Sequence, residues 1–189
     1  MPAIKSGVRV SINNVSKLLA STNALATTEV MVGIPSNKAL RSDKTGINSA
    51  ELGYIHEHGA PEVGIPARPF LEPTVKDKQT SLIEPTLRKA ALAAFSGDPG
   101  KVTNLLSGLG QEVADAARDR IVAGIPPKLK DATIIARARR KQAYKKAKGA
   151  KRAELRAKAL EDGGTPLIDT GQLMRSITWV LRKVSRKSK

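Results

Sequence analysis

The chain has 189 residues, no cysteine, and a formal net charge of +16 from 33 Lys and Arg against 17 Asp and Glu. This length is enough for one domain with a hydrophobic core and short for two. The lack of cysteine excludes disulfides, thiolate catalysis and cysteine–zinc sites. No apolar run approaches the roughly 18 residues that a membrane span needs, so we expect no membrane contact.

The positive charge is concentrated in the last third of the sequence. Residues 1–127 contain 14 basic and 12 acidic residues, a net +2, whereas residues 128–189 contain 19 basic and 5 acidic residues, a net +14. We therefore expect a near-neutral α+β domain formed by residues 1–127 and 161–184. A basic helical limb of residues 128–160 is inserted before the last strand, and residues 185–189 form a disordered tail.

The first predicted elements are a helix and a strand. Residues 12–25 carry apolar side chains at helical spacing, with Asn13 or Asn14 as the N-cap. Residues 27–34 alternate as a strand, and residues 36–47 read as a loop. The strand would place three apolar side chains on one face: Val30, Val32 and Ile34.

A short helix over residues 48–58 is predicted to be closed at both ends. Asn48 and Glu51 have the spacing of a capping box, and Gly59 lies where a left-handed C-cap would fall. Residues 59–69 hold three prolines and two glycines. They predict an irregular but restrained connection.

Two further helices are predicted next. Helical spacing runs over residues 70–94, where Pro85 must kink or break the helix. Asp98 as N-cap and Pro99 at the first helical position mark the start of the second helix. Its apolar residues form the clearest amphipathic stripe in the chain, which we expect to pack on the sheet: Val102, Leu105, Leu106, Leu109, Val113, Ala116, Ala117 and Ile121.

The limb is predicted to be helical over residues 131–160, which are rich in Ala, Lys and Arg, and to end at Gly163. Residues 172–175 add a helical turn, and residues 176–184 form the last strand. The expected fold is α+β, with a small mixed or antiparallel sheet backed by helices and a long basic helical extension.

The two histidines, His56 and His58, do not have zinc-site spacing. A helical zinc pair needs i, i+4 spacing, whereas i, i+2 sends the two rings to opposite sides of a helix. We interpret them as polar helix-end residues, one of which bonds to the following loop. We predict no metal site and no cofactor.

No residue pattern indicates catalysis. The serines lie in no Gly-x-Ser-x-Gly elbow. Asp169, Thr170 and Gly171 superficially resemble a phosphotransferase loop, but a Gly-rich cradle with a lysine is missing. We predict that the chain is not an enzyme and has no catalytic residues, and we interpret Asp169 as a cap for the short turn after it.

The basic side chains of the limb are too many to share one helix face. Phosphate neutralisation needs only Lys and Arg and reads no sequence. Tyr144 is the only aromatic residue in the limb, which argues against specific single-strand binding. Three roles stay open: non-specific contact with duplex DNA, contact with an acidic protein partner, or a solvated arm. The residues concerned are Arg137, Arg139, Arg140, Lys141, Lys145, Lys146, Lys148, Lys151, Arg152, Arg156 and Lys158.

Two ordered sets of residues resemble a known family. The first set is residues 32–35 (VGIP), 50–59 (AELGYIHEHG) and 65–71 (IPARPFL). The second set is residues 125–129 (IPPKL), 132–134 (ATI), 165–173 (TPLIDTGQL) and 176–178 (SIT). Together they resemble the minor tail and virion-morphogenesis proteins of tailed phages, found at the tail-completion or neck position. The resemblance spans residues 27–184.

The resemblance implies a small α+β structural subunit that forms a six-fold or twelve-fold ring around the DNA channel. Such a ring joins or seals head and tail, next to head-completion and tail-terminator or tail-tube rings. Its place is the virion neck or tail, after assembly in the host bacterial cytoplasm. The family has no known active site, and its members often have a shorter connection where this chain has the basic limb.

The matching residues have structural roles under this resemblance. Arg68, held between Ala67 and Pro69, would anchor a loop or bond a carboxylate of a neighbouring subunit. Phe70 and Leu71 would enter the core, and Asp169 would shape the turn that leads to the last strand.

A competing hypothesis is a free, non-specific nucleic-acid-binding accessory protein. It rests on the basic last third alone and predicts duplex binding by the monomer, with an affinity that falls steeply as salt rises. It leaves the near-neutral first two-thirds without a role. A hydrolase acting on cell wall or DNA lacks any candidate constellation of residues.

Overall fold

The computed structural model describes residues 14–38, 40 and 46–184. Three sequence predictions fall wholly or partly outside these residues: Asn13 as a helix cap, the loop over residues 36–47, and the tail at 185–189. Of that loop, residues 36–38, 40, 46 and 47 are described, and η1 (Ser36–Lys38) forms a 3-10 turn at its start.

The sheet of the described chain consists of two antiparallel strands, β1 (Thr28–Gly33) and β2 (Thr178–Lys183). The helix α1 (Val15–Thr27) leads directly into β1. Asn14 is its N-cap residue, but the Asn14 side chain makes no capping hydrogen bond. In the ladder Val30 lies opposite Leu181 and Val32 opposite Trp179. These four side chains are partly buried and share the face that packs on the helices, which confirms the predicted alternation.

The predicted helix over residues 70–94 is continuous in space but changes its winding in the middle. It consists of α3 (Glu72–Lys78), a π-helical turn η3 (Gln79–Ile83), and α4 (Glu84–Phe95). Pro85 lies in the first turn of α4. A proline ring clashes with the carbonyl four residues before it in a regular α-helix, and a wider π turn relieves that clash. The predicted distortion therefore takes the form of a π turn.

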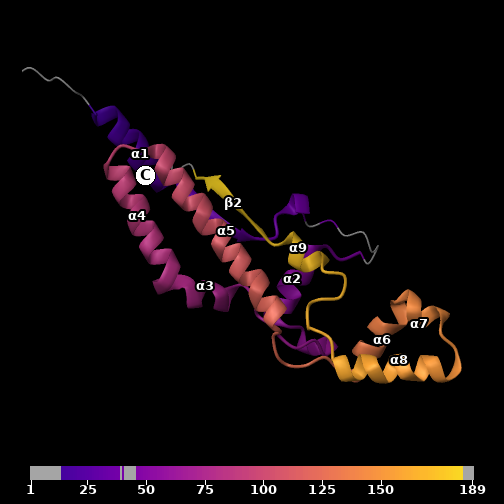
Figure 1. The fold of residues 1–189 in the computed structure, drawn as a ribbon. Helices are drawn as coiled ribbons and strands as arrows, with labels where there is room; N and C mark the ends of the chain where they lie inside the picture. Colours follow the sequence, from indigo (N-terminus) through magenta and orange to yellow (C-terminus); the bar gives the residue numbers. More distant parts are fainter. Residues whose placement is uncertain (1–13, 39, 41–45, 185–189) are drawn as a thin grey trace, which may run out of the picture.

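The long helix α5 (Pro99–Ala123) is the central element of the body. Its N-cap is Asp98, whose side chain accepts a hydrogen bond from the Lys101 amide at 2.9 Å. Figure 1 shows α5 running the length of the body between α4 and the sheet. Six of the eight residues of the predicted stripe are buried and the other two are partly buried, so the stripe packs as expected.

The apolar residues form two clusters along α5. One joins α4 and the first half of α5 through buried residues such as Ala94, Val102 and Leu106. The other lies at the far half of α5 and contains Phe70, Ile121, Ile125, Leu167, Leu173 and Ile177. Around the second cluster lie α2 (Ser49–His58) and α9 (Gln172–Ser176), and the 3-10 turn η2 (Pro61–Val63) belongs to the connection after α2.

The limb is helical, as predicted, but it is three short helices and not one long one. They are α6 (Asp131–Arg140), α7 (Gln142–Lys146) and α8 (Gly149–Asp162). The backbone is extended at Lys141 and again at Ala147, which turns the chain so that α8 packs against α6. Figure 1 shows the three helices (orange) folded together beyond the end of α5, away from the rest of the body.

Candidate functional site

Parts of the two ordered residue sets, residues 50–59, 65–71 and 125–129, meet where α2, α3 and the loop after α5 come together. Glu57, near the end of α2, extends its carboxylate to the first backbone amides of α3. One or both carboxylate oxygens accept hydrogen bonds from Phe70 N at 2.8 Å, from Leu71 N at 3.0 and 3.2 Å, and from Glu72 N at 2.7 Å. The first amides of a helix have no partner within the helix, and its positive dipole end favours an anion. Glu57 therefore acts as an N-cap for α3 supplied from another helix.

The α2 helix is itself capped as predicted. The Asn48 side chain accepts from Ala50 N and Glu51 N, and the Glu51 carboxylate accepts from Asn48 N, each at 2.9 Å. The prediction for Gly59 is wrong in one respect. Gly59 has a positive φ of 78° but a ψ of 172°, outside the left-handed helical region. An added Cβ there would lie 2.7 Å from Ala67 N, because the two ends of the irregular connection are in contact.

Arg68 anchors a loop of its own chain. Arg68 is 7% exposed, and its Nε and Nη2 both donate to the Pro127 carbonyl, at 3.2 and 2.9 Å. Burial lowers the pKa of the Arg68 guanidinium from its ordinary value. These two bonds describe the loop-anchor role, one of the two roles expected for Arg68. Phe70, 3% exposed, lies in the core as predicted.

The histidines lie at the end of α2. The His58 ring lies 4.4 Å from the Tyr54 ring, centroid to centroid, with the planes tilted by 55°. The His56 backbone carbonyl accepts from Arg68 N at 2.7 Å. This backbone bond ties the helix end to the following loop. Within the described ranges, no group of three or more His, Asp and Glu side chains could hold a metal ion.

Asp169 joins the limb to the body, and its prediction as a cap is wrong. The N-cap of α9 is Gly171, with no side-chain capping bond. The Asp169 carboxylate instead accepts from Arg140 Nη2 at 2.6 Å and lies 3.9 Å from Arg137 Nε. The Asp169 carboxylate binds these two arginines and does not cap α9, because α6 brings their guanidinium groups to the turn.

Arg137 is a structural residue and not a surface cation. Its Nη1 donates to the Thr165 and Ile168 carbonyls, at 3.0 and 2.8 Å. Burial lowers the pKa of Arg137, and the nearby Asp169 partly offsets that effect. Together with Asp169, it fixes α6 to the segment that returns to the body.

The other ten basic residues of the predicted surface are exposed. Two of them also make bonds within the limb: the Arg152 Nε donates to the Ala147 carbonyl at 3.0 Å, and Lys151 pairs with Glu154 at 3.3 Å. The structure thus brings ten of the eleven predicted cations to the surface of one compact helical unit.

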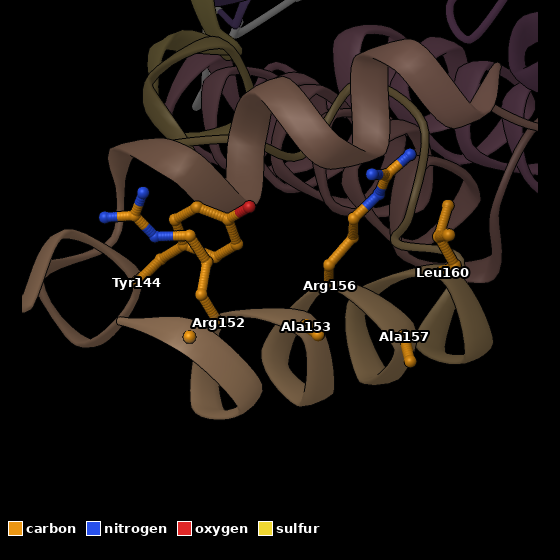
Figure 2. Close-up of a pocket in the computed structure, with 7 residues that line it drawn as sticks. Tyr144, Arg152, Ala153, Arg156, Ala157 and Leu160 are labelled. Carbon is orange, nitrogen blue, oxygen red and sulfur yellow. The ribbon is translucent and has the colours of Figure 1, made fainter. Parts of the chain in front are cut away.

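The limb also contains an open groove of about 500 Å³ along α8. Figure 2 shows Arg152 and Arg156 extending from α8 with Tyr144 beside Arg152. The Arg152 guanidinium lies over the Tyr144 ring, 5.7 Å from its centroid, a cation–π arrangement. Sequence reasoning treated these residues only as part of the general charge.

Two residues of this region were missed by the sequence interpretation. Glu57 was noted only as part of the HEHG segment, although the glutamate lies just before a stiff loop that leads to a helix start. The sequence interpretation counts Arg137 among the surface cations. Its burial is indicated by its position one helical turn after Ile134, on the side of α6 that is buried.

Comparisons with known proteins give no relative: no protein-family model, curated protein or solved structure matches the chain. Among the described residues, no helix is long and apolar enough to cross a membrane.

Proposed function

We propose that this chain is a structural subunit of a tailed-phage virion that assembles as a ring at the neck or tail-completion level. The observation that carries the proposal is how the two resembling segment sets come together. Phe70 and Leu71 of the first set pack in one cluster with Ile125, Leu167 and Leu173 of the second. Residues far apart in the sequence, all from the two sets that resemble one family, thus pack together in a single joint.

The chemistry of that joint supports a structural role. Its polar groups are engaged in holding backbone: Glu57 binds the start of α3, and Arg68 binds the Pro127 carbonyl. Groups committed to such contacts are poor candidates for proton transfer or nucleophilic attack. The joint therefore fits a rigid subunit better than an enzyme.

The arrangement of limb and body supports placement beside the DNA channel. The cations are gathered on a unit that projects from one end of the body (Figure 1). In a closed ring, equivalent limbs would form a ring of positive charge next to the packaged DNA or an acidic surface of an adjacent ring.

Cryo-electron microscopy of the neck of the intact virion tests the proposal, together with mass spectrometry of purified virions. The expected result is a closed ring of this subunit at the head–tail junction, present in a fixed small copy number per virion. Absence of the chain from purified virions would overturn the proposal.

The ten exposed limb cations favour a second candidate, a free accessory protein that binds nucleic acid without sequence specificity. It predicts a monomer that binds duplex DNA and is missing from the finished virion. Native mass spectrometry of the purified chain, alone and mixed with the neighbouring ring proteins, separates the two candidates by oligomeric state.

A further inference from the structure

One face of α8 is built as the wall of the limb groove. Gly149, Arg152, Ala153, Arg156, Ala157 and Leu160 follow one another at spacings of one, three or four, which places them on the same side of the helix. Tyr144 of α7 lines the same groove. The alanines are small enough to leave space between the two longer arginines, as Figure 2 shows.

The two arginines place like charges on one face of the helix. Arg152 and Arg156 are four residues apart, and such a like-charge pair costs an isolated helix about 0.2–0.5 kcal/mol. None of the residues that line the groove carries a carboxylate that would offset this cost. Guanidinium groups match phosphate oxygens well in geometry and charge. The groove therefore presents two guanidinium groups whose charge an anion would neutralise.

Tyr144 limits which kind of nucleic-acid contact the groove can make. Arg152 covers the face of the Tyr144 ring, and the Arg152 Nε is held by the Ala147 carbonyl. A base cannot stack on an aromatic face that a guanidinium already covers. The same two contacts hold Arg152 in place, so its remaining donors are directed without further loss of side-chain entropy. The groove is suited to the phosphate backbone and not to bases.

The remaining limb cations favour an extended polyanion over an acidic patch on a protein. Lys151 and Lys158 lie on the opposite face of α8, and Lys145 and Lys148 lie at the end of the limb beside Tyr144 and Gly149, all exposed. A protein surface complements one face of a helical unit. Charge outside the groove instead attracts an extended polyanion at long range, while the direct contacts are made at the groove.

We propose that the α8 groove binds the phosphodiester backbone of duplex DNA through Arg152 and Arg156, independently of sequence. This names the partner of the limb and rests on the proposed function only for its place in the virion. Each phosphate contact releases counterions, so the binding weakens as salt rises.

The test is a titration of the full-length protein against a mixed-sequence DNA duplex by fluorescence anisotropy at several salt concentrations. Arg156→Gln and Lys158→Gln remove the same charge from opposite faces of α8. We expect Arg156→Gln to weaken binding about tenfold and to lower the salt slope by about 0.9, the value of one phosphate contact. Lys158→Gln should cost less than threefold. Equal losses of affinity in both variants, or no duplex binding by the unmodified protein, would contradict the proposal that the groove binds DNA.

A second pair of variants leaves the charge unchanged. Ala153→Leu fills the groove, whereas Ala150→Leu adds the same volume to an exposed position of α8 outside it. Duplex affinity should fall only for Ala153→Leu, with unchanged circular dichroism in both. A competition experiment adds poly-glutamate to the DNA complex at equal charge concentration. If poly-glutamate displaces the DNA and the two variants bind DNA equally well, the partner of the limb is an acidic protein and the proposed DNA site is wrong.

The outcome can be separated from that of the proposed function. If the subunit forms a ring in the virion neck but the groove variants bind DNA normally, only the groove inference fails. If the groove variants lose DNA binding but the chain is missing from virions, the groove stands and the neck assignment fails.

Discussion

Glu57 accepts hydrogen bonds from the backbone amide of Leu71 with both of its carboxylate oxygens, at 3.2 and 3.0 Å. The two residues belong to different helical segments, separated by an irregular connection with three prolines. The bond, with its neighbours to Phe70 and Glu72, fixes where α3 begins relative to α2. The angle between these helices is thus set by a side chain and not by the loop alone.

Replacing Glu57 by alanine should destabilise the protein by about 2 kcal/mol, because the start of α3 loses its anionic cap and the partly buried amides of Phe70 and Leu71 lose their acceptor. Urea unfolding measures this loss. Glu62→Ala, at an exposed position of η2, is the matched control and should change stability by under about 0.5 kcal/mol. Equal losses in the two variants would mean that the cap contributes nothing.

Arg68→Ala should cost about 2–3 kcal/mol, because the Pro127 carbonyl loses a charged donor in a buried place. Arg68→Lys should recover only part of the loss, since an ammonium cannot offer the two donors of the guanidinium fork. Thermal unfolding monitored by circular dichroism gives the comparison, with Arg88→Ala on the exposed side of α4 as the control. Full recovery by lysine would show that charge alone matters at this site.

Gly110 and Gly108 should respond to alanine in opposite directions. A Cβ at Gly110 would lie 2.9 Å from Trp179 Cγ, so Gly110→Ala must push α5 away from β2, at a cost of about 1–3 kcal/mol. Gly108 has open space, and Gly108→Ala should stabilise α5 by about 0.5–1 kcal/mol.

Thermal unfolding tests both signs, and Trp179, the only tryptophan, reports on the local packing. Its emission should shift to the red in Gly110→Ala and stay unchanged in Gly108→Ala. Stabilisation by both substitutions would contradict the close approach of helix and strand.

Asp169→Asn should loosen the limb without unfolding the body. Asp169 and Arg140 are both partly exposed, so losing their ion pair should lower global stability by under about 1 kcal/mol. Hydrogen exchange of the α6 amides should nevertheless become faster, because α6 loses a tie to the returning chain. Glu154→Gln, which breaks an ion pair wholly inside α8, is the control and should leave α6 unchanged. Unaltered exchange in Asp169→Asn would show that Arg137 alone holds the limb.

The elements predicted correctly from the sequence are those governed by local chemistry. Asn48 and Asp98 cap their helices because a capping side chain reaches amides only two or three residues away. The stripe on α5 and the alternation in β1 are likewise set by a period that the sequence shows directly. The distortion near Pro85 was predictable, although its π geometry was not.

The failures share a different cause. Helix propensity is high throughout the limb, but the chain turns at Lys141 because folding α8 back onto α6 buries Ile134 and Ala138. Asp169 has the position of a cap, yet its partner Arg140 lies 29 residues earlier. Glu57 binds amides 13 to 15 residues away. Contacts of this kind depend on how the loops close, which no local pattern contains.

The separation of charge along the molecule has a consequence for how it approaches a partner. Residues 128–160 carry a net charge of +11, whereas residues 1–127 and 161–184 together carry +2, so the protein has a permanent electric dipole directed toward the limb. In the field of a polyanion such a dipole turns limb-first before any contact is made, at a rate that falls as ionic strength rises. The first step of association would therefore select the orientation of each subunit. The contacts formed later between the protein and its partner would then stabilise that orientation.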